Sequence, residues 1–124
     1  MVTNSLKMYL KLNRKKPLCP QICEQICSCI VNGNIKPGER IESVRDFSNE
    51  INVNPNTVQN AFVRLRKQGV LTSIRGTGWF VSRDLELIHK IHEETIMRKT
   101  KEYIADMYAL GMSLDELKEY VKEF

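Results

Sequence analysis

Side chains that can read or hold nucleic acid are concentrated in one short stretch of the sequence, residues 54–64. They are Asn54, Asn56, Thr57, Gln59, Asn60 and Arg64. Asn and Gln can pair bidentately with adenine, Thr can touch a thymine methyl group or a phosphate, and Arg can read guanine or hold the phosphate backbone. Taken singly, each residue is more often part of a solvated helix face, so the inference of DNA contact depends on the surrounding elements.

The same stretch has the pattern of an amphipathic helix. Asn54 is a favourable N-cap, Pro55 suits the first helical position, and Gly69 ends the helix. The apolar side is formed by Val58, Ala61, Phe62 and Leu65. A helix with an apolar back and short polar side chains near its N-terminus fits the major groove of B-DNA, and free amides at that end attract phosphate.

A second predicted helix comes immediately before this one and opens at Ser43, whose hydroxyl can accept the N–H of Asp46. Its apolar side is formed by Val44, Phe47 and Ile51. Two helices joined by a tight turn form a helix-turn-helix. We add Ser43 and Arg45 to the predicted DNA-contacting residues, because this helix lies beside the recognition helix and an arginine can hold the DNA backbone or read guanine.

Beyond Gly69 the hydrophobic period changes from 3.6 to 2. The runs 70–74 and 79–81 are rich in β-prone residues and flank an Arg-Gly-Thr-Gly sequence at 75–78. This pattern predicts a hairpin, or wing. The glycines of its tip permit close approach to a phosphate or entry into the minor groove, and Arg75 beside Gly76 is the charged probe.

The remaining pattern completes the predicted fold class, which is mainly α with a small β-wing. A helix is expected at 18–31, a short extended piece at 40–41, a long helix at about 84–110, and a last helix opened by a capping box of Ser113 and Glu116. The predicted domains are a basic N-terminal extension (1–16), a winged helix-turn-helix (17–83) and a dimerisation segment of two helices (84–124).

Composition and charge agree with a small globular binding protein. The chain has 124 residues, of which 42% are hydrophobic and 27% charged, and no apolar run approaches the ~20 residues of a membrane span. We expect no membrane contact and no secretory signal, and therefore a cytoplasmic location. Up to residue 84 there are 13 Lys and Arg against 6 Asp and Glu, a net charge of +7, whereas the rest carries 6 against 9, a net charge of −3. The front part is the part that suits a polyanion.

The two C-terminal helices carry more apolar surface than a thin appendage can bury on itself. The residues concerned are Ile88, Ile91, Ile96, Tyr103, Ile104, Met107, Leu114 and Leu117. We expect a second copy of the chain to bury this apolar surface in a dimer. A two-fold dimer would require an inverted-repeat operator in double-stranded DNA.

Four cysteines lie close together, Cys19, Cys23, Cys27 and Cys29. Their spacing matches none of the paired C-x-x-C patterns of structural zinc, and small apolar packing residues are the commoner role of cysteine in such a helix. We predict no metal and no cofactor. A thiol- or metal-responsive regulator remains the alternative. His89 and His92 beside Glu93 are weak catalytic candidates, so no enzyme is expected.

Several short motifs, in order and spacing, resemble the winged helix-turn-helix of GntR-family bacterial transcription regulators. They are Pro-Leu at 17–18, Gln-Ile at 21–22, Ile-Lys-Pro-Gly-Glu at 35–39, Ser-Val-Arg-Asp at 43–46, Val-Asn-Pro-Asn-Thr-Val at 53–58, Gln-Gly at 68–69 and Arg-Gly-Thr-Gly at 75–78. The helical tail of about 40 residues is similar to the YtrA-type subfamily, which lacks a large ligand-binding domain and dimerises through its C-terminal helices.

The resemblance implies a homodimeric, nucleoid-associated DNA-binding repressor, in which Arg45, the start of the recognition helix and the wing tip contact the operator. It suggests control of transporter genes, and it identifies no effector. The sequence departs from the family pattern at Cys19, where an aromatic residue is usual, at Glu42, where proline is usual, and at Gln59, where some relatives have arginine. A winged-helix module for protein–protein contact is the main alternative function.

Overall fold

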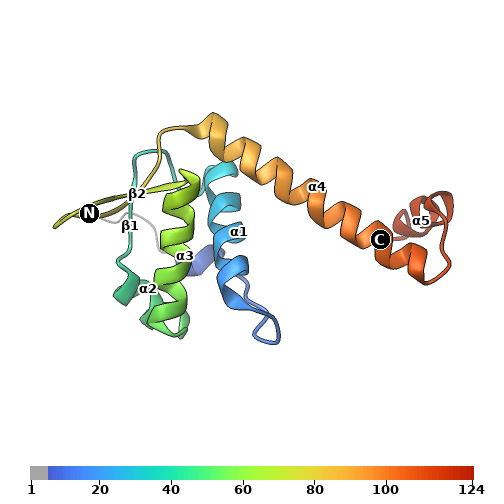
Figure 1. Ribbon diagram of the computed structural model, residues 1–124, viewed down its shortest axis with the longest axis horizontal. Helices are drawn as coiled ribbons and strands as arrows, with labels where there is room; N and C mark the ends of the chain where they lie inside the picture. Colours follow the sequence, from blue (N-terminus) through green and yellow to red (C-terminus); the bar gives the residue numbers. More distant parts are fainter. Residues whose placement is uncertain (1–5) are drawn as a thin grey trace. The chain divides into compact units, whose positions relative to one another are not determined.

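The structure is a computed structural model that describes residues 6–124; residues 1–5, the start of the predicted basic extension, lie outside the described residues. Along the chain (Figure 1) the elements are η1 (Leu6–Tyr9), α1 (Leu18–Val31), β1 (Arg40–Ile41), α2 (Val44–Ile51), α3 (Pro55–Gln68), β2 (Leu71–Ile74), β3 (Gly78–Val81), α4 (Leu85–Ala109) and α5 (Leu114–Val121). This order confirms the predicted fold class. The chain divides into two compact units, the first ending at His92 and the second comprising Glu93–Phe124.

The helix ends follow the local signals in the sequence. Ser43 Oγ accepts the N–H of Asp46 at 3.1 Å and caps α2. Asn52 takes a left-handed conformation at the end of that helix, with φ 55°, which asparagine tolerates better than most residues. α3 ends at Gly69, whose φ of 86° favours glycine and whose added Cβ would lie 2.8 Å from Leu87 Cδ2. A side chain at position 69 would therefore be both strained and crowded.

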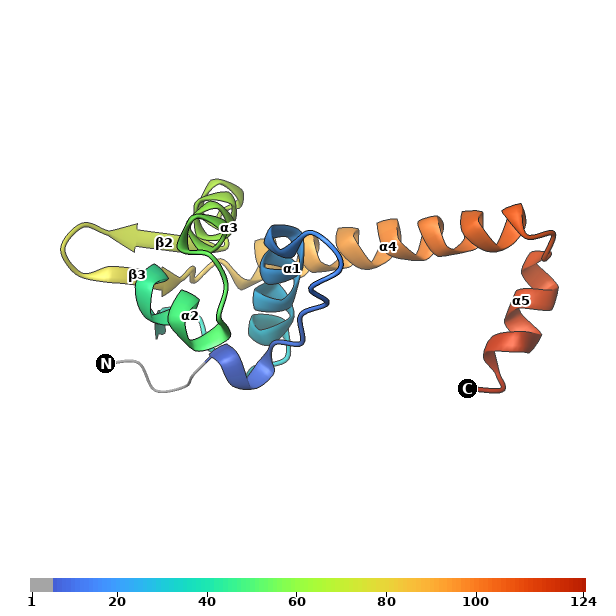
Figure 2. The ribbon, with the colours of Figure 1, turned by 90° about the horizontal axis from the view of Figure 1, so that it is seen from below.

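The core of the first unit is organised around Phe62 of α3, which has no exposed surface. Its ring lies 5.8 Å from the ring of Phe47 in α2 and 5.3 Å from the ring of Trp79 in β3, the second pair edge to face. The helices α1, α2 and α3 pack together around this core, with the β-hairpin attached to them (Figure 2). Phe62 thus joins both helices of the helix-turn-helix to the sheet.

The sheet has three antiparallel strands in the order β1-β3-β2. The predicted hairpin is confirmed, with Leu71 opposite Val81, but the strand β1 extends it by pairing Arg40 with Phe80. The sequence pattern predicted an extended piece at 40–41 but not its pairing with β3, because two residues carry no periodicity and the partner of Arg40 lies 40 positions away. The edge is reinforced by the Val81 N–H, which bonds the Glu39 carbonyl at 2.8 Å.

The segment 6–16, which we call the N-terminal strap, is part of the first unit. Leu6 is fully buried in the core. The side-chain amide of Gln25 on α1 accepts the Lys11 N–H and donates to the Lys11 carbonyl, both at 2.7 Å. Gln21, one turn earlier, binds the N–H and carbonyl of Asn13 in the same way, at 2.7 and 2.9 Å. The segment predicted as a basic extension is therefore packed against the helices.

The helix α4 begins in the first unit, which corrects one predicted dimer residue. Ile88 is fully buried in the core of its own chain, and Ile91 is partly buried against that core. Ile88 is not accessible to a second chain, because the first turns of α4 pack on the winged domain. In the second unit Leu117 is buried and the capping box of Ser113 and Glu116 is confirmed, with both hydrogen bonds at 3.2 Å.

Replacing the central aromatic side chain should destabilise the first unit strongly. We expect Phe62→Ala to lower the free energy of unfolding by about 3–5 kcal/mol, because it removes a buried ring and leaves a cavity. Chemical denaturation at one fixed protein concentration measures the change. Lys67→Ala, an exposed position on the same helix, is the control and should change stability by less than about 0.5 kcal/mol. Equal stabilities of the two variants would contradict this account of the core.

Candidate nucleic-acid interface

The helix α3 separates its apolar and polar side chains as the sequence predicts. Val58, Ala61, Phe62 and Leu65 have no exposed surface. Of the predicted DNA-contacting residues on this helix, Asn56, Gln59, Asn60 and Arg64 are exposed, and Thr57 is half-buried. Because the apolar side is fixed in the core, the amide-rich side faces outward over most of the helix. This surface can present hydrogen-bonding groups to the edges of bases.

The first turn of α3 does not offer the free amides that the sequence predicted. The Asn54 side chain accepts the N–H of Asn56 at 2.8 Å, and the Asn54 carbonyl accepts the N–H of Thr57 at 3.0 Å and of Val58 at 3.2 Å. Pro55 has no N–H to give. The prediction of phosphate binding by these amides is therefore wrong, and what remains at this end is the positive end of the helix dipole.

The residues predicted on α2 lie beside this surface, because α2 packs against α3. Ser43 is exposed; its Oγ is used as an acceptor for the cap of α2, and its hydroxyl hydrogen is left to donate. Arg45, the second residue of α2, is also exposed. A hydroxyl donor and a guanidinium at this edge are groups that can hold a phosphate backbone.

The wing presents the other predicted contacts at the turn between β2 and β3, where Arg75 and Gly76 are exposed. Thr77 N–H closes the turn on the Ile74 carbonyl at 2.9 Å. Gly76 has φ of 77°, and nothing lies within 4 Å of the Cβ that another residue would add. Backbone conformation therefore favours glycine here, and the open space around it lets the tip approach another molecule.

Two arginines that the sequence analysis did not single out support the wing. Arg66, in the last turn of α3, donates to Ser73 Oγ at 3.2 Å and lies 5.5 Å from the centre of the Trp79 ring. Arg40 on β1 lies beside Gly78, where an added Cβ would be 3.1 Å from its Nε. No local pattern could identify either residue, since the role of Arg66 depends on how the hairpin packs on α3, and Arg40 and Gly78 are far apart in the sequence.

The four cysteines lie on α1 and are all free. Burial and, to a smaller extent, the neighbouring Cys19 together raise the pKa of Cys23 to about 12, while Arg64 opposes the shift. Burial also raises the pKa values of Cys27 and Cys29 to about 11. Cys23 donates to the Ala61 carbonyl at 3.5 Å. These three thiols are therefore protonated packing groups at neutral pH.

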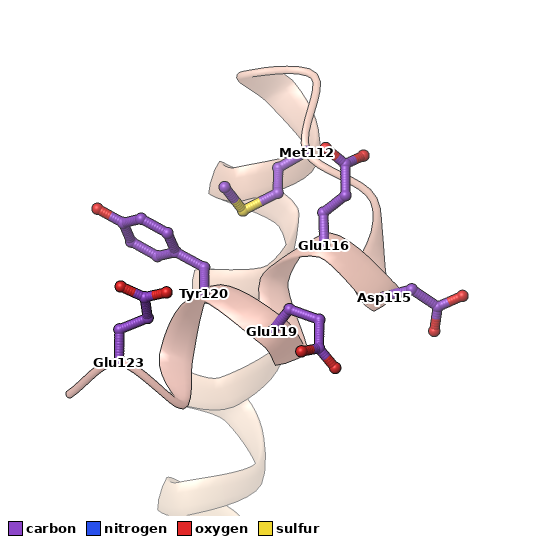
Figure 3. Close-up of a pocket in the computed structure, with 6 residues that line it drawn as sticks. All are labelled: Met112, Asp115, Glu116, Glu119, Tyr120 and Glu123. Carbon is purple, nitrogen blue, oxygen red and sulfur yellow. The ribbon is translucent and has the colours of Figure 1, made fainter.

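The two units differ in what they can bind. The second unit has a surface pocket formed by Met112, Asp115, Glu116, Glu119, Tyr120 and Glu123 (Figure 3). Its four carboxylates repel a polyanion, which leaves the first unit as the part that suits DNA.

Across the described residues, no three His, Cys, Asp or Glu side chains converge on a metal position. Within residues 6–124, no helix has both the length and the apolar character needed to cross a membrane.

Comparison with known proteins gives one consistent family. Residues 19–81 match the model of bacterial regulatory proteins of the gntR family. The chain is 32% identical to the HTH-type transcriptional repressor YtrA of Bacillus subtilis over 108 residues, covering 86% of this chain and 83% of that protein. A GntR family transcriptional regulator from Listeria monocytogenes has a similar structure, with a TM-score of 0.80, 28% identity and coverage of 91% of this chain and 99% of that one.

A further similar structure contains DNA. It is the DNA-binding domain of AraR in complex with the operator ORX1, with a TM-score of 0.52 and 30% identity, covering 60% of this chain and 98% of that chain.

The raised thiol pKa values predict which cysteine reacts. In the native protein at pH 8 we expect iodoacetamide to modify Cys19, which is half-buried, well before the other three, because only the thiolate is nucleophilic. Mass spectrometry of the digested protein locates the modified residue. Cys19→Ser should abolish the early modification, and unfolding in guanidinium should make all thiols react. Early modification of Cys23 or Cys27 at the rate of Cys19 would contradict the assignment of these thiols to the core.

Proposed function

Because the chain belongs to the GntR family of bacterial regulatory proteins, and is therefore a transcriptional regulator and not an enzyme, we propose that it is a homodimeric repressor that binds an inverted-repeat operator. The main support for DNA binding is the polar side of α3, which faces outward because the apolar side of the helix is fully buried. The AraR domain, which is similar to 60% of this chain, is bound to an operator in its structure.

In this proposal the winged domain, residues 17–83, reads the operator. Asn56, Thr57, Gln59 and Asn60 meet base edges in the major groove, as amides and a hydroxyl can. The phosphate-facing residues are Ser43, Arg45, Asn54 and Arg64. Arg75 and Gly76 enter the adjacent minor groove or meet its phosphates. The net charge of +7 up to residue 84 favours this reading over a module for protein contact.

The segment 84–124 dimerises in this proposal. Ile96 and Tyr103 are each 47% exposed, and Leu114 is 37% exposed. Ile104 and Met107 are only partly buried. The second unit also exposes apolar residues outside the predicted set, namely Met97, Tyr108, Leu110, Tyr120, Val121 and Phe124. Many exposed apolar residues on a small helical unit are typical of a surface covered by a partner. Ile88 and Leu117 are left out of the predicted dimer surface, since each is buried in its own chain.

The proposals about repression, target genes and location follow the similarity to YtrA-type repressors. The relative from Bacillus subtilis is named a transcriptional repressor, which supports repression over activation. Transporter genes as targets, and action at the nucleoid in the cytoplasm, are carried over from the YtrA-type subfamily that the tail resembles.

The DNA-contacting residues can be tested with DNA fragments enriched from a random pool by the full-length protein. Arg45→Ala and Arg75→Ala should each weaken binding to the enriched fragments by about 1–3 kcal/mol without loss of folding, because a charged contact to phosphate or base is removed. Fluorescence anisotropy at moderate salt measures the change. Lys122→Ala, at the exposed end of the second unit, is the control. Unchanged binding curves for both arginine variants would rule out these contacts.

The proposed dimer can be tested by sedimentation at micromolar concentration. The full chain should be a dimer, and truncation after His92, which keeps Ile88 and Ile91 on the core, should give a monomer. The truncated protein should bind a half-site only weakly, because two winged domains are no longer joined in one molecule. The double variant Ile96→Asp, Tyr103→Asp should behave similarly in the full-length chain. A monomeric full-length protein, or a truncated form that still dimerises, would contradict the role of this segment.

A further inference from the structure

The N-terminal strap is attached to both ends of α2, the first helix of the helix-turn-helix. At the start of the helix, the Leu6 N–H donates to Glu42 Oε1 at 2.8 Å. At its end, the Arg14 guanidinium donates to the Ile51 carbonyl at 2.6 Å and to the Asn52 carbonyl at 3.1 Å. Asn52 lies two residues before Asn54, the cap of α3. The strap therefore spans α2 and reaches the turn that orients the recognition helix.

The attachments of the strap differ in their response to pH. Gln21 and Gln25 on α1 bind its backbone through neutral amides, which do not titrate. The Arg14 guanidinium stays charged at any pH at which the protein is folded. Glu42 is the one member of this set whose charge can change near neutral pH.

The surroundings of Glu42 oppose a negative charge. Glu42 is only 6% exposed. Its Oε2 is buried, and in the ionised form this oxygen has no hydrogen-bond donor among the described residues. The neighbouring carboxyl group is that of Glu50, and the two side chains can share a hydrogen bond only when one of them carries a proton. Asp46 of α2 adds a second negative charge, whereas η1 contributes the Leu6 amide and an exposed Lys7.

These surroundings shift the titration of Glu42 into the physiological range. Burial raises the pKa of Glu42 to about 7; the Leu6 N–H opposes this shift, and Glu50 and Asp46 add to it. The folded state thus binds a proton that the unfolded state loses at its ordinary pKa of about 4.5. The stabilisation by that proton is present at low pH, falls as the pH rises above about 4.5, and is lost by about pH 7.

We propose that Glu42 makes the strap a pH-sensitive clamp, in which the protonated carboxyl stays covered by η1 and the ionised carboxylate releases η1 from α2. The protonated group donates to Glu50 and accepts from Leu6, so both of its oxygens are satisfied beneath the strap. The carboxylate faces Glu50 and Asp46, and no residue from 6 to 124 offers a donor to Oε2, so it can be hydrated only where η1 moves away. Any effect on operator binding rests on the proposed function, but the release of the strap does not.

Limited proteolysis of the full-length chain tests the release. Trypsin cleaves after lysine and arginine, and Lys7 and Lys11 lie in the strap. The cleavage rate there is measured from pH 6 to pH 8 for the native protein and for Glu42→Gln, which keeps an oxygen for the Leu6 N–H but cannot ionise. Dividing the two rates at each pH removes the pH dependence of trypsin. The ratio should rise with the ionised fraction of Glu42, by up to about tenfold between pH 6 and pH 8 for a midpoint near pH 7.

Two further variants sharpen the experiment. Glu50→Gln should move the midpoint of the ratio to lower pH, because it removes the neighbouring negative charge, whereas Glu24→Gln on α1 should leave the midpoint unchanged. The carboxyl carbon shift of Glu42 in the native protein gives the titration directly, so the proposal stays testable if a variant does not fold. A ratio that is flat from pH 6 to pH 8, or a Glu42 carboxyl that titrates below pH 5, would overturn it. Failure of DNA binding alone would leave both readouts unchanged.

Discussion

The burial of the apolar side of α3 is the contact on which the rest of the first unit depends. Phe62 occupies the centre of that side, in contact with aromatic rings from α2 and from β3. Because this ring has no exposed surface, the rotation of α3 about its own axis is fixed. The amide-rich residues then have only one direction to face. A binding surface made of side chains that are individually unremarkable becomes specific through the core behind it.

The same contact determines where the wing lies. Trp79 packs against Phe62 from one direction and lies near the Arg66 guanidinium, which also bonds Ser73 on the neighbouring strand. An isolated two-stranded hairpin is only marginally stable in water. Here the third strand, β1, and the packing of Trp79 support it. The tip at Arg75 and Gly76 is therefore carried on a base that is tied to the recognition helix, which is what joint contact with two grooves requires.

A buried acid beneath the N-terminal strap is a feature that the family resemblance does not lead one to expect. At position 42, where the resemblance to GntR regulators leads one to expect proline, this chain has a buried glutamate, and one of its oxygens receives no hydrogen bond from the described residues. A buried acid of this kind favours its protonated form. The strap that covers it is held by glutamines, an arginine and the buried Leu6. This part of the fold combines several contacts whose charge does not change near neutral pH with one contact that titrates there.

The sequence by itself determined the features that arise within a few residues. The caps at Ser43, Asn54 and Ser113, the stop at Gly69 and the glycine-bearing hairpin tip are short-range signals, and together they were enough to predict the winged helix-turn-helix and the polar surface of α3. The use of the α3 amides by Asn54 is also local, but it became visible only in the hydrogen-bond geometry, because a cap that is recognised by residue type does not show which amides it will occupy. Only the tertiary structure decided the pairing of β1, the packing of the strap and the burial of Ile88. These three are contacts between groups far apart in the chain, which periodicity cannot reveal.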